Sequence, residues 1–340
     1  MFGLGWLRAL TDARGLLEHA HHGVPRLGEG YTTDDNARAL LYLSLLPEGA
    51  RDEGLVRTYL AFLLHMQKED GRFRNGLTLD GRFEDEGEAE DPTGRAVLAL
   101  AAAQRLPPPY AGPAREALLR ALPALEGFTS LRGRAYALLG LLALPKEPFL
   151  EAAEALGEGL LRAFREAEPA WPYPGPLTYA NHRPVEALYA YGLTFRRQEA
   201  VALARRALAF LKEHYFTPGE EGLFFDPVGN RFMARGRDKP LFDQQPIEAK
   251  CALLAHLRFG ERVLAEVAFL WFHGRNRLRA PLVDAFGPMD GLTPHGPNQN
   301  RGAEALLAYL LAWQALVQGV FPQVDEGVAL GRVFALGGRP

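Results

Sequence analysis

Residues 30–43 spell GYTTDDNARALLYL, a polar segment that runs without a break into a stretch rich in alanine and leucine. The apolar residues recur with the period of an α-helix and cover nearly all of its sides, as they do in a fully buried helix. Five later stretches repeat this pattern, with a charged residue followed by alanine near the start. They are PTGRAVLAL, LRGRAYALL, RPVEALYAY, QPIEAKCAL and RGAEALLAY, and the six charged positions are Arg38, Arg95, Arg134, Glu186, Glu248 and Glu304.

The spacing of these repeats predicts the fold. The charged positions lie 39 to 62 residues apart, which leaves room for one further helix and its loops in each interval. The intervening helices, such as residues 197–215, have one apolar stripe and a charged opposite face. Helix pairs that bury their apolar faces only against neighbours are typical of repeat architectures. We therefore predict an all-α (α/α)6 toroid, with six inner and six outer helices, short β-hairpins in its loops and a single domain over residues 1–320, followed by a C-terminal tail over residues 321–340.

The individual elements follow from helical periodicity and from turn residues. Short hairpins are predicted within residues 71–83 and 222–236. The predicted helices cover residues 4–21, 34–46, 51–68, 92–105, 113–128, 131–144, 146–168, 183–195, 197–215, 246–259, 261–272 and 301–318.

The polar residues before the inner helices suggest a binding site. In the predicted toroid every inner helix begins at the same end, and the long loops that precede these helices gather there. Some polar residues will act as N-caps. However, the segments TTDD, EAED, YANHR, FDQQ and PNQNR hold more hydrogen-bonding groups than helix ends require, and aromatic residues lie near them. This combination is suited to a polyhydroxylated ligand, such as a sugar.

Composition excludes several other classes. The chain has 340 residues, of which 48% are hydrophobic and 23% charged, and a formal net charge of -3, so it lacks the basic surface that nucleic-acid binding needs. Its single cysteine, Cys251, provides neither a disulfide nor a cysteine zinc site. No signal peptide or membrane-spanning run is evident. We expect a soluble, cytoplasmic protein with no cofactor, no bound metal, no nucleic-acid partner and no membrane association.

The motifs GYTTDDNARAL, DGRFRNGL, EDPTGRA, LTYANHRPVEAL, FDQQPIEA and GLTPHGPNQNRGAEALLAYL resemble the six-hairpin glycosidase-like superfamily. More narrowly, they are similar to a bacterial group that occurs beside, or fused behind, glycosyltransferases and mannoside phosphorylases. The resemblance covers nearly the whole chain and implies carbohydrate handling. Because the predicted toroid begins near Met1, we expect no glycosyltransferase domain before it, and therefore either a glycosyltransferase partner or an activity of its own.

Candidate chemistry follows from the acids. Hydrolysis of a glycosidic bond uses one protonated and one ionised carboxyl group, which stand about 6.5–9.5 Å apart in inverting enzymes. The leading pair is Asp34 or Asp35 with Asp91, from neighbouring inner helices, and Asp243 is a third candidate. Which of Asp34 and Asp35 faces the ligand stays open. The predicted substrate-binding residues are Tyr31, Asn36, Arg74, Asn75, Trp171, Tyr179, Asn181, His182, Gln244, Gln245, Glu248, His295, Asn298 and Asn300.

Two alternatives belong to other classes. A sugar epimerase or isomerase would move a proton with histidine, for which His182 and His295 are the candidates. A non-catalytic glycan-binding module would keep the aromatic and amide groups but needs no acid–base pair. The abundance of acids favours an inverting glycoside hydrolase that acts on oligosaccharides, with mannosides as the first choice.

Overall fold

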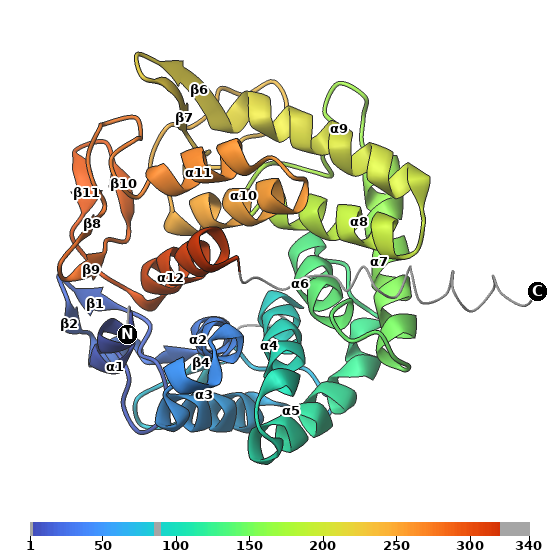
Figure 1. Ribbon diagram of the computed structural model, residues 1–340, viewed down its shortest axis with the longest axis vertical. Helices are drawn as coiled ribbons and strands as arrows, with labels where there is room; N and C mark the ends of the chain where they lie inside the picture. Colours follow the sequence, from blue (N-terminus) through green and yellow to red (C-terminus); the bar gives the residue numbers. More distant parts are fainter. Residues whose placement is uncertain (1–2, 85–89, 320–340) are drawn as a thin grey trace, which may run out of the picture.

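Six buried helices form a closed inner ring in the part of the chain that the structure describes (Figure 1). The structure is a computed structural model and describes residues 3–84 and 90–319. Each inner helix packs against the next one, and the last packs against the first. The inner helices are α2 (Thr33–Leu45), α4 (Glu90–Ala102), α6 (Leu131–Leu141), α8 (His182–Thr194), α10 (Pro246–Arg258) and α12 (Ala303–Gln318).

An outer layer of amphipathic helices surrounds this ring. In α9, for example, Ala204, Leu208 and Leu211 are buried at intervals of three and four residues, while the arginines between them are exposed. The predicted (α/α)6 toroid is therefore confirmed. The outer helices are α1 (Leu4–Ala9), α3 (Glu53–Met66), α5 (Pro108–Ala121), α7 (Phe149–Arg165), α9 (Gln198–Tyr215) and α11 (Arg262–Leu270). In the described residues, no helix combines the length and apolar character needed to cross a bilayer.

The connections contain short antiparallel strands and 3-10 turns. The hairpin predicted within residues 71–83 is formed by β4 and β5, and β3 joins it as a third strand. The strands are β1 (Ala20–His21), β2 (Val24–Pro25), β3 (Tyr31–Thr32), β4 (Gly76–Leu77), β5 (Phe83–Glu84), β6 (Phe216–Gly219), β7 (Gly222–Phe225), β8 (Val283–Asp284), β9 (Gly287–Pro288), β10 (Gly291–Thr293) and β11 (Gly296–Asn298). The 3-10 turns are η1 (Leu27–Glu29), η2 (Glu48–Ala50), η3 (Ala103–Arg105) and η4 (Leu122–Leu125).

Two local predictions are wrong. The helix predicted over residues 4–21 ends at Ala9, because the Asp12 carboxylate accepts hydrogen bonds from the backbone N–H groups of Arg14 and Gly15 and forms a tight turn. The hairpin predicted within residues 222–236 lies earlier, since β7 pairs backwards with β6. The predicted tail over residues 321–340 lies outside the described residues, and the domain boundary at residue 320 stays a prediction.

Glycines bring α4 and α6 unusually close together. A Cβ atom on Gly94 would lie 2.4 Å from the carbonyl oxygen of Gly133, and one on Gly140 would lie 2.7 Å from the Cα of Leu98. Both distances are too short for any side chain, so the backbones touch along most of the two helices. This contact brings the first turn of α4 next to the residues that begin α6.

Candidate active site at the amino ends of the inner helices

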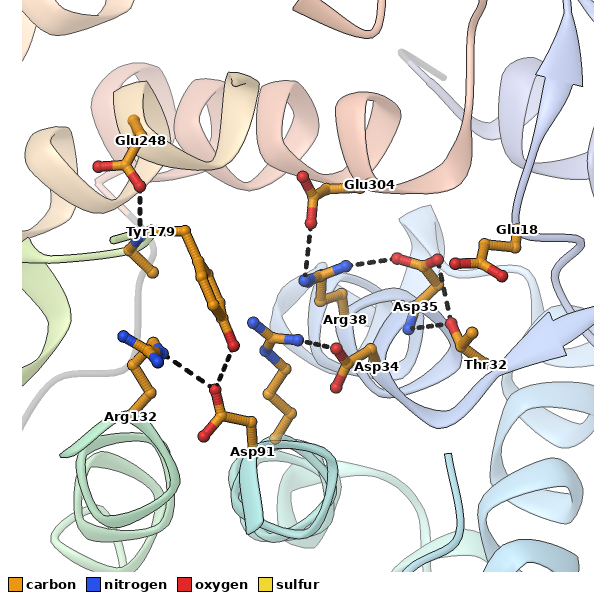
Figure 2. A network of polar contacts seen from close by, with 12 residues as sticks. Glu18, Thr32, Asp34, Asp35, Arg38, Asp91, Arg132, Tyr179, Glu248 and Glu304 are labelled. Carbon is orange, nitrogen blue, oxygen red and sulfur yellow. Dashed lines mark hydrogen bonds and ion pairs between the residues drawn. The ribbon is translucent and has the colours of Figure 1, made fainter. Parts of the chain in front are cut away.

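Polar contacts at the amino ends of the inner helices join five neighbouring pairs of the ring, from α12 through α2, α4, α6 and α8 to α10, and Figure 2 shows several of them. This confirms that these ends meet on one side of the toroid, which we call the amino face. It also means that acids from remote segments of the chain come together at this face. The contacts, in order around the ring, are Glu304–Arg38, Asp34–Arg95, Asp91–Ser130, Arg132–Thr178 and Glu248–Ala180 N–H.

The first turn of α2 holds Asp35 in a capping arrangement. The Thr32 hydroxyl accepts a hydrogen bond from the Asp35 backbone N–H at 3.3 Å and donates one to the Asp35 carboxylate at 3.1 Å. The same carboxylate pairs with Arg38, which also reaches Glu304 on α12 at 3.1 Å. Burial raises the pKa of Asp35, and Arg38 offsets only part of that rise. Thr32, rather than Asp34, is the N-cap of this helix.

Asp34 points away from its neighbour and across to α4. Its carboxylate pairs with Arg95, and its backbone N–H donates to the Asn75 side chain at 3.4 Å. The Asp34 side chain is 22% exposed, against 4% for Asp35. Of the two adjacent acids, Asp34 is thus the more accessible one.

Asp91 is held as an ionised carboxylate. Ser130 donates to it at 2.6 Å, Tyr179 at 2.5 Å, and the Arg132 guanidinium lies at 3.1 Å. Burial alone would raise the pKa of Asp91, but the hydrogen bonds from Ser130 and Tyr179 outweigh it. The charges of Arg95 and Arg132 act in the same direction, so the net effect is a lowered pKa. Arg132 also stacks over the Tyr179 ring at 4.1 Å.

Glu18 joins this group, although it is not among the site residues predicted from the sequence. It precedes β1 and lies beside Asp35 in Figure 2, with its side chain 33% exposed. Burial and the neighbouring carboxylate of Asp35 raise the pKa of Glu18 to about 7. Because the predicted helix over residues 4–21 placed Glu18 on the outer layer, only the turn signal at Asp12 to Gly15 could have indicated its true position.

Glu248, in the first turn of α10, is the second carboxyl group with a strongly raised pKa. It is almost completely buried and accepts a hydrogen bond from the Ala180 backbone N–H, while its Oε2 atom has no partner among the described residues. Burial raises its pKa to about 7. Glu248 is therefore protonated in part of the molecules at neutral pH.

We expect the raised pKa of Glu248 to make the stability of the protein pH-dependent. Between pH 4.5, the ordinary value, and about 7, the folded chain keeps a proton that the unfolded chain releases. Stability should therefore fall as pH rises through this window. In Glu248→Gln, which keeps the hydrogen-bond acceptor but does not ionise, the fall should be smaller. Urea midpoints at pH 5 and pH 8 measure it, with Glu116→Gln on exposed α5 as the control. Equal pH dependence in wild type and Glu248→Gln would contradict this account.

Several predicted binding residues instead pack inside the protein. His182 is fully buried, with its ring edge-on to Tyr215 at 4.8 Å, and burial lowers its pKa well below the usual range. Asn181 is also buried and donates to the Tyr215 hydroxyl at 2.7 Å. The prediction that these two side chains face a ligand is thus corrected. Helix periodicity predicted correctly at which end of the ring these residues lie, but it did not predict the direction of their side chains.

The same correction applies to residues on the approach to α2. The Tyr31 ring is buried against Phe62, and its hydroxyl donates to Asp12 at 2.6 Å. Asn36 is buried as well, and its amide bonds to the backbone of Leu16 and Thr32. These groups brace the turn that brings the start of the chain against α2.

Two further predicted binding residues have partners within the protein. Trp171 packs edge-on to Phe210 of the outer helix α9 at 4.8 Å, and its Nε1–H donates to the Gly175 carbonyl oxygen. Gln244 is buried, donates to Asp226 at 2.8 Å and accepts from the Trp271 indole at 2.8 Å. Gln244 is therefore enclosed in the protein, whereas Trp171 is partly exposed and stays a predicted binding residue.

The remaining candidates lie at the surface or at loop ends. Asp243 and His295 are exposed, and Gln245 is the N-cap residue of α10 without a side-chain capping bond. The Arg74 guanidinium stacks over Phe83 at 4.2 Å. Asn298 and Asn300 accept hydrogen bonds from backbone N–H groups of nearby loop residues. The amino face therefore unites Asp34, Asp35, Asp91, Asn75, Tyr179 and Glu248, and the structure adds Glu18 and Glu304.

Metal-binding residues do not gather at this face. Within residues 3–84 and 90–319, no three carboxylate, imidazole or thiol groups are arranged as a metal site requires. Asp34, Asp35, Asp91 and Glu304 are instead paired with arginines.

Solved structures with the same architecture are sugar-converting enzymes and glycosidases. A D-mannose isomerase matches with a TM-score of 0.68 at 11% identity, over 94% of this chain and 95% of that chain. Cellobiose 2-epimerase from Bacillus thermoamylovorans matches with a TM-score of 0.66 at 8% identity, over 91% and 95%. A GH76 α-mannanase from Bacteroides thetaiotaomicron matches with a TM-score of 0.62 at 11% identity, over 98% and 95%. These likenesses establish the fold that the six-hairpin glycosidase-like resemblance implied. No protein-family model and no curated protein matches the sequence.

Proposed function

We propose that the protein is an enzyme that hydrolyses glycosidic bonds in oligosaccharides at the amino face. The observation that carries this proposal is the opposite displacement of carboxyl pKa values within one face. Glu18 has a pKa of about 7, whereas hydrogen bonds and nearby cations hold the pKa of Asp91 below its usual value. Two carboxyl groups whose pKa values are shifted in opposite directions supply an acid and a base at the same pH.

The roles follow from these states. Asp91, ionised and fixed by Ser130 and Tyr179, is suited to activate a water molecule. The proton for the leaving oxygen comes from the cluster at the start of α2, in which Glu18 is the partly exposed member that holds a proton near neutral pH. Asp34, paired with Arg95, stands on α2 and links this cluster to α4. The proposal places acid and base on separate segments, and inversion requires about 6.5–9.5 Å between them, which leaves room for the attacking water.

Histidine chemistry has less support. The two histidines expected to serve an epimerase or isomerase are His182, which is enclosed in the core, and His295, which is exposed on a loop. The solved structures of this fold include isomerase and epimerase as well as mannanase, so the fold does not choose between the reactions. The arrangement of the acids does favour hydrolysis.

The test is a survey of substrates. We expect wild-type protein to release reducing sugar from α-linked manno-oligosaccharides, and ¹H NMR of the anomeric protons should show a product of inverted configuration. The α-mannosides come first because of the resemblance stated above and the GH76 α-mannanase among the fold neighbours. Cellobiose and free mannose serve as comparison substrates. Conversion of either one to an epimer without bond cleavage would support the epimerase instead, and binding without turnover would support a glycan-binding module. The cytoplasmic location and the glycosyltransferase partner stay predictions from the sequence.

A further inference from the structure

A small pocket lies on the axis of the toroid, next to the amino face. It is lined by side chains from all six inner helices, which places it at the centre of the ring. Its free volume is about 10 Å³, enough for roughly one water-sized particle. Aliphatic side chains of α2, α4 and α12 form part of its wall. The rest of the wall is Tyr136 and four basic residues, Arg38, Arg95, Arg183 and Lys250.

The three arginines of this pocket are neutralised by carboxylates. Arg38 pairs with Asp35 and Glu304. Arg95 and Arg183 have their own partners, and these are Asp34 and Glu186. The positive charges of the guanidinium groups are therefore balanced without any further group in the pocket.

Lys250 is the basic residue of the pocket that has no carboxylate partner among the described residues. Its side chain lines the pocket, the residue is 2% exposed, and it has neither a hydrogen bond nor an ion pair with any residue that the structure describes. An isolated buried ammonium group is costly, and proteins normally provide it with a partner. Burial, together with the charges of Arg183, Arg38 and Arg95, lowers the pKa of Lys250 to about 8. The neighbouring Cys251 does not compensate, because burial raises its pKa and keeps the thiol neutral.

Hydrogen-bond donors without partners also indicate that the pocket lacks a further acceptor. The Nε–H groups of Arg38, Arg95 and Arg183 are buried and have no hydrogen-bond partner among the described residues. With the Lys250 ammonium, they make four donating groups, and the Tyr136 hydroxyl oxygen on the same wall already accepts a hydrogen bond from Arg95 at 3.4 Å. A water molecule offers two lone pairs and no negative charge, so it would leave donors unsatisfied and the charge unbalanced.

We infer that this axial pocket binds a small inorganic anion of the halide class, which Lys250 and the surrounding guanidinium groups hold. A halide is only slightly larger than water, accepts hydrogen bonds from several directions and gives the Lys250 ammonium a negatively charged partner. Phosphate and sugar carboxylates are too large for the space. The halide site does not depend on the proposed hydrolysis, because it is inferred from Lys250 and the guanidinium groups of the axial pocket.

Thermal unfolding at constant ionic strength tests the site. Wild-type protein is exchanged into gluconate buffer and titrated with chloride or bromide. We expect a saturable rise in Tm of about 5 °C at a large excess over Kd. Lys250→Met removes the unpaired ammonium group and keeps the volume of the side chain. Without halide, this variant should unfold at a higher temperature than wild type, and added halide should not change its Tm. Lys212→Met, on an exposed position of α9, should respond as wild type does.

A crystal of the wild-type protein soaked in bromide gives an independent readout, which holds even if Lys250→Met fails to fold. We expect an anomalous peak within hydrogen-bonding distance of the Lys250 Nζ atom. The inference is overturned if that peak is absent, or if chloride shifts the Tm of wild type and of Lys250→Met equally. A response to phosphate that exceeds the response to chloride would also overturn it.

Discussion

Replacement of Asp91 by asparagine should lower kcat/KM on an oligosaccharide substrate by about 10²–10⁴-fold, which is the contribution expected of a positioned general base. Asparagine keeps the size, and its single carbonyl oxygen accepts one of the hydrogen bonds that Ser130 and Tyr179 donate to the two carboxylate oxygens, but it takes up no proton. The loss should therefore appear in kcat, with KM little changed. Initial rates over a range of substrate concentrations measure both constants.

A matched control separates this effect from a general loss of charge. Glu199 pairs with Arg165 on the outer layer, far along the chain from any amino-face residue, and Glu199→Gln should keep wild-type activity. The Tm of both variants shows whether they are folded. If folded Asp91→Asn keeps most of its kcat, Asp91 is not the base. A higher KM with unchanged kcat would indicate that Asp91 is a binding residue.

Removal of Glu186 should cost about 3–5 kcal/mol of the free energy of unfolding, the usual result of breaking a buried ion pair by removing one member. The Glu186 carboxylate on α8 is buried and pairs with Arg183 of the same helix and with Arg258 of α10, the latter at 3.0 Å. In Glu186→Ala, Arg183 loses its only carboxylate partner among the described residues, inside the inner ring. Equilibrium unfolding in urea measures the loss.

Two comparisons make this result specific. Glu186→Gln keeps an acceptor and removes only the charge, so its loss should be the smaller one. Glu199→Ala breaks an exposed pair on the outer layer and should leave the unfolding midpoint almost unchanged. Similar losses in Glu186→Ala and Glu199→Ala would contradict the buried-pair explanation.

The toroid could be predicted because the residue types of each helix indicate how much of its surface is buried. Inner helices such as α8 and α10 are surrounded on all sides, so alanine and leucine occupy nearly every position, whereas the outer helix α9 keeps a charged face. Asp34 and Asp91 lie in the first turns of α2 and α4, and Arg95 lies one turn further along α4. That these helix starts share one end follows from the repeat. This much depends only on helical period and on the order of elements.

The orientation of individual side chains was beyond such a prediction. Among the residues that precede the inner helices, Ser130 caps α6 and Thr32 caps α2 through their side chains, whereas Gly302 precedes α12 without a side-chain cap. A shift of one or two residues in the helix start rotates a side chain from the axis into the core, as happens at His182. Glu18 was missed for a different reason, since a turn at Asp12 interrupts an otherwise helical pattern.

The central claim is that remote acids act together on one saccharide at the amino face. A crystal structure of folded Asp91→Asn with bound mannobiose tests it most directly, because the substitution slows turnover while the rest of the face is kept. We expect the disaccharide to lie over the first turns of α2 and α4, with its glycosidic oxygen within hydrogen-bonding reach of a carboxyl group from Glu18, Asp34 or Asp35. A disaccharide bound at the opposite end of the toroid, or on the outer helices, would contradict the account.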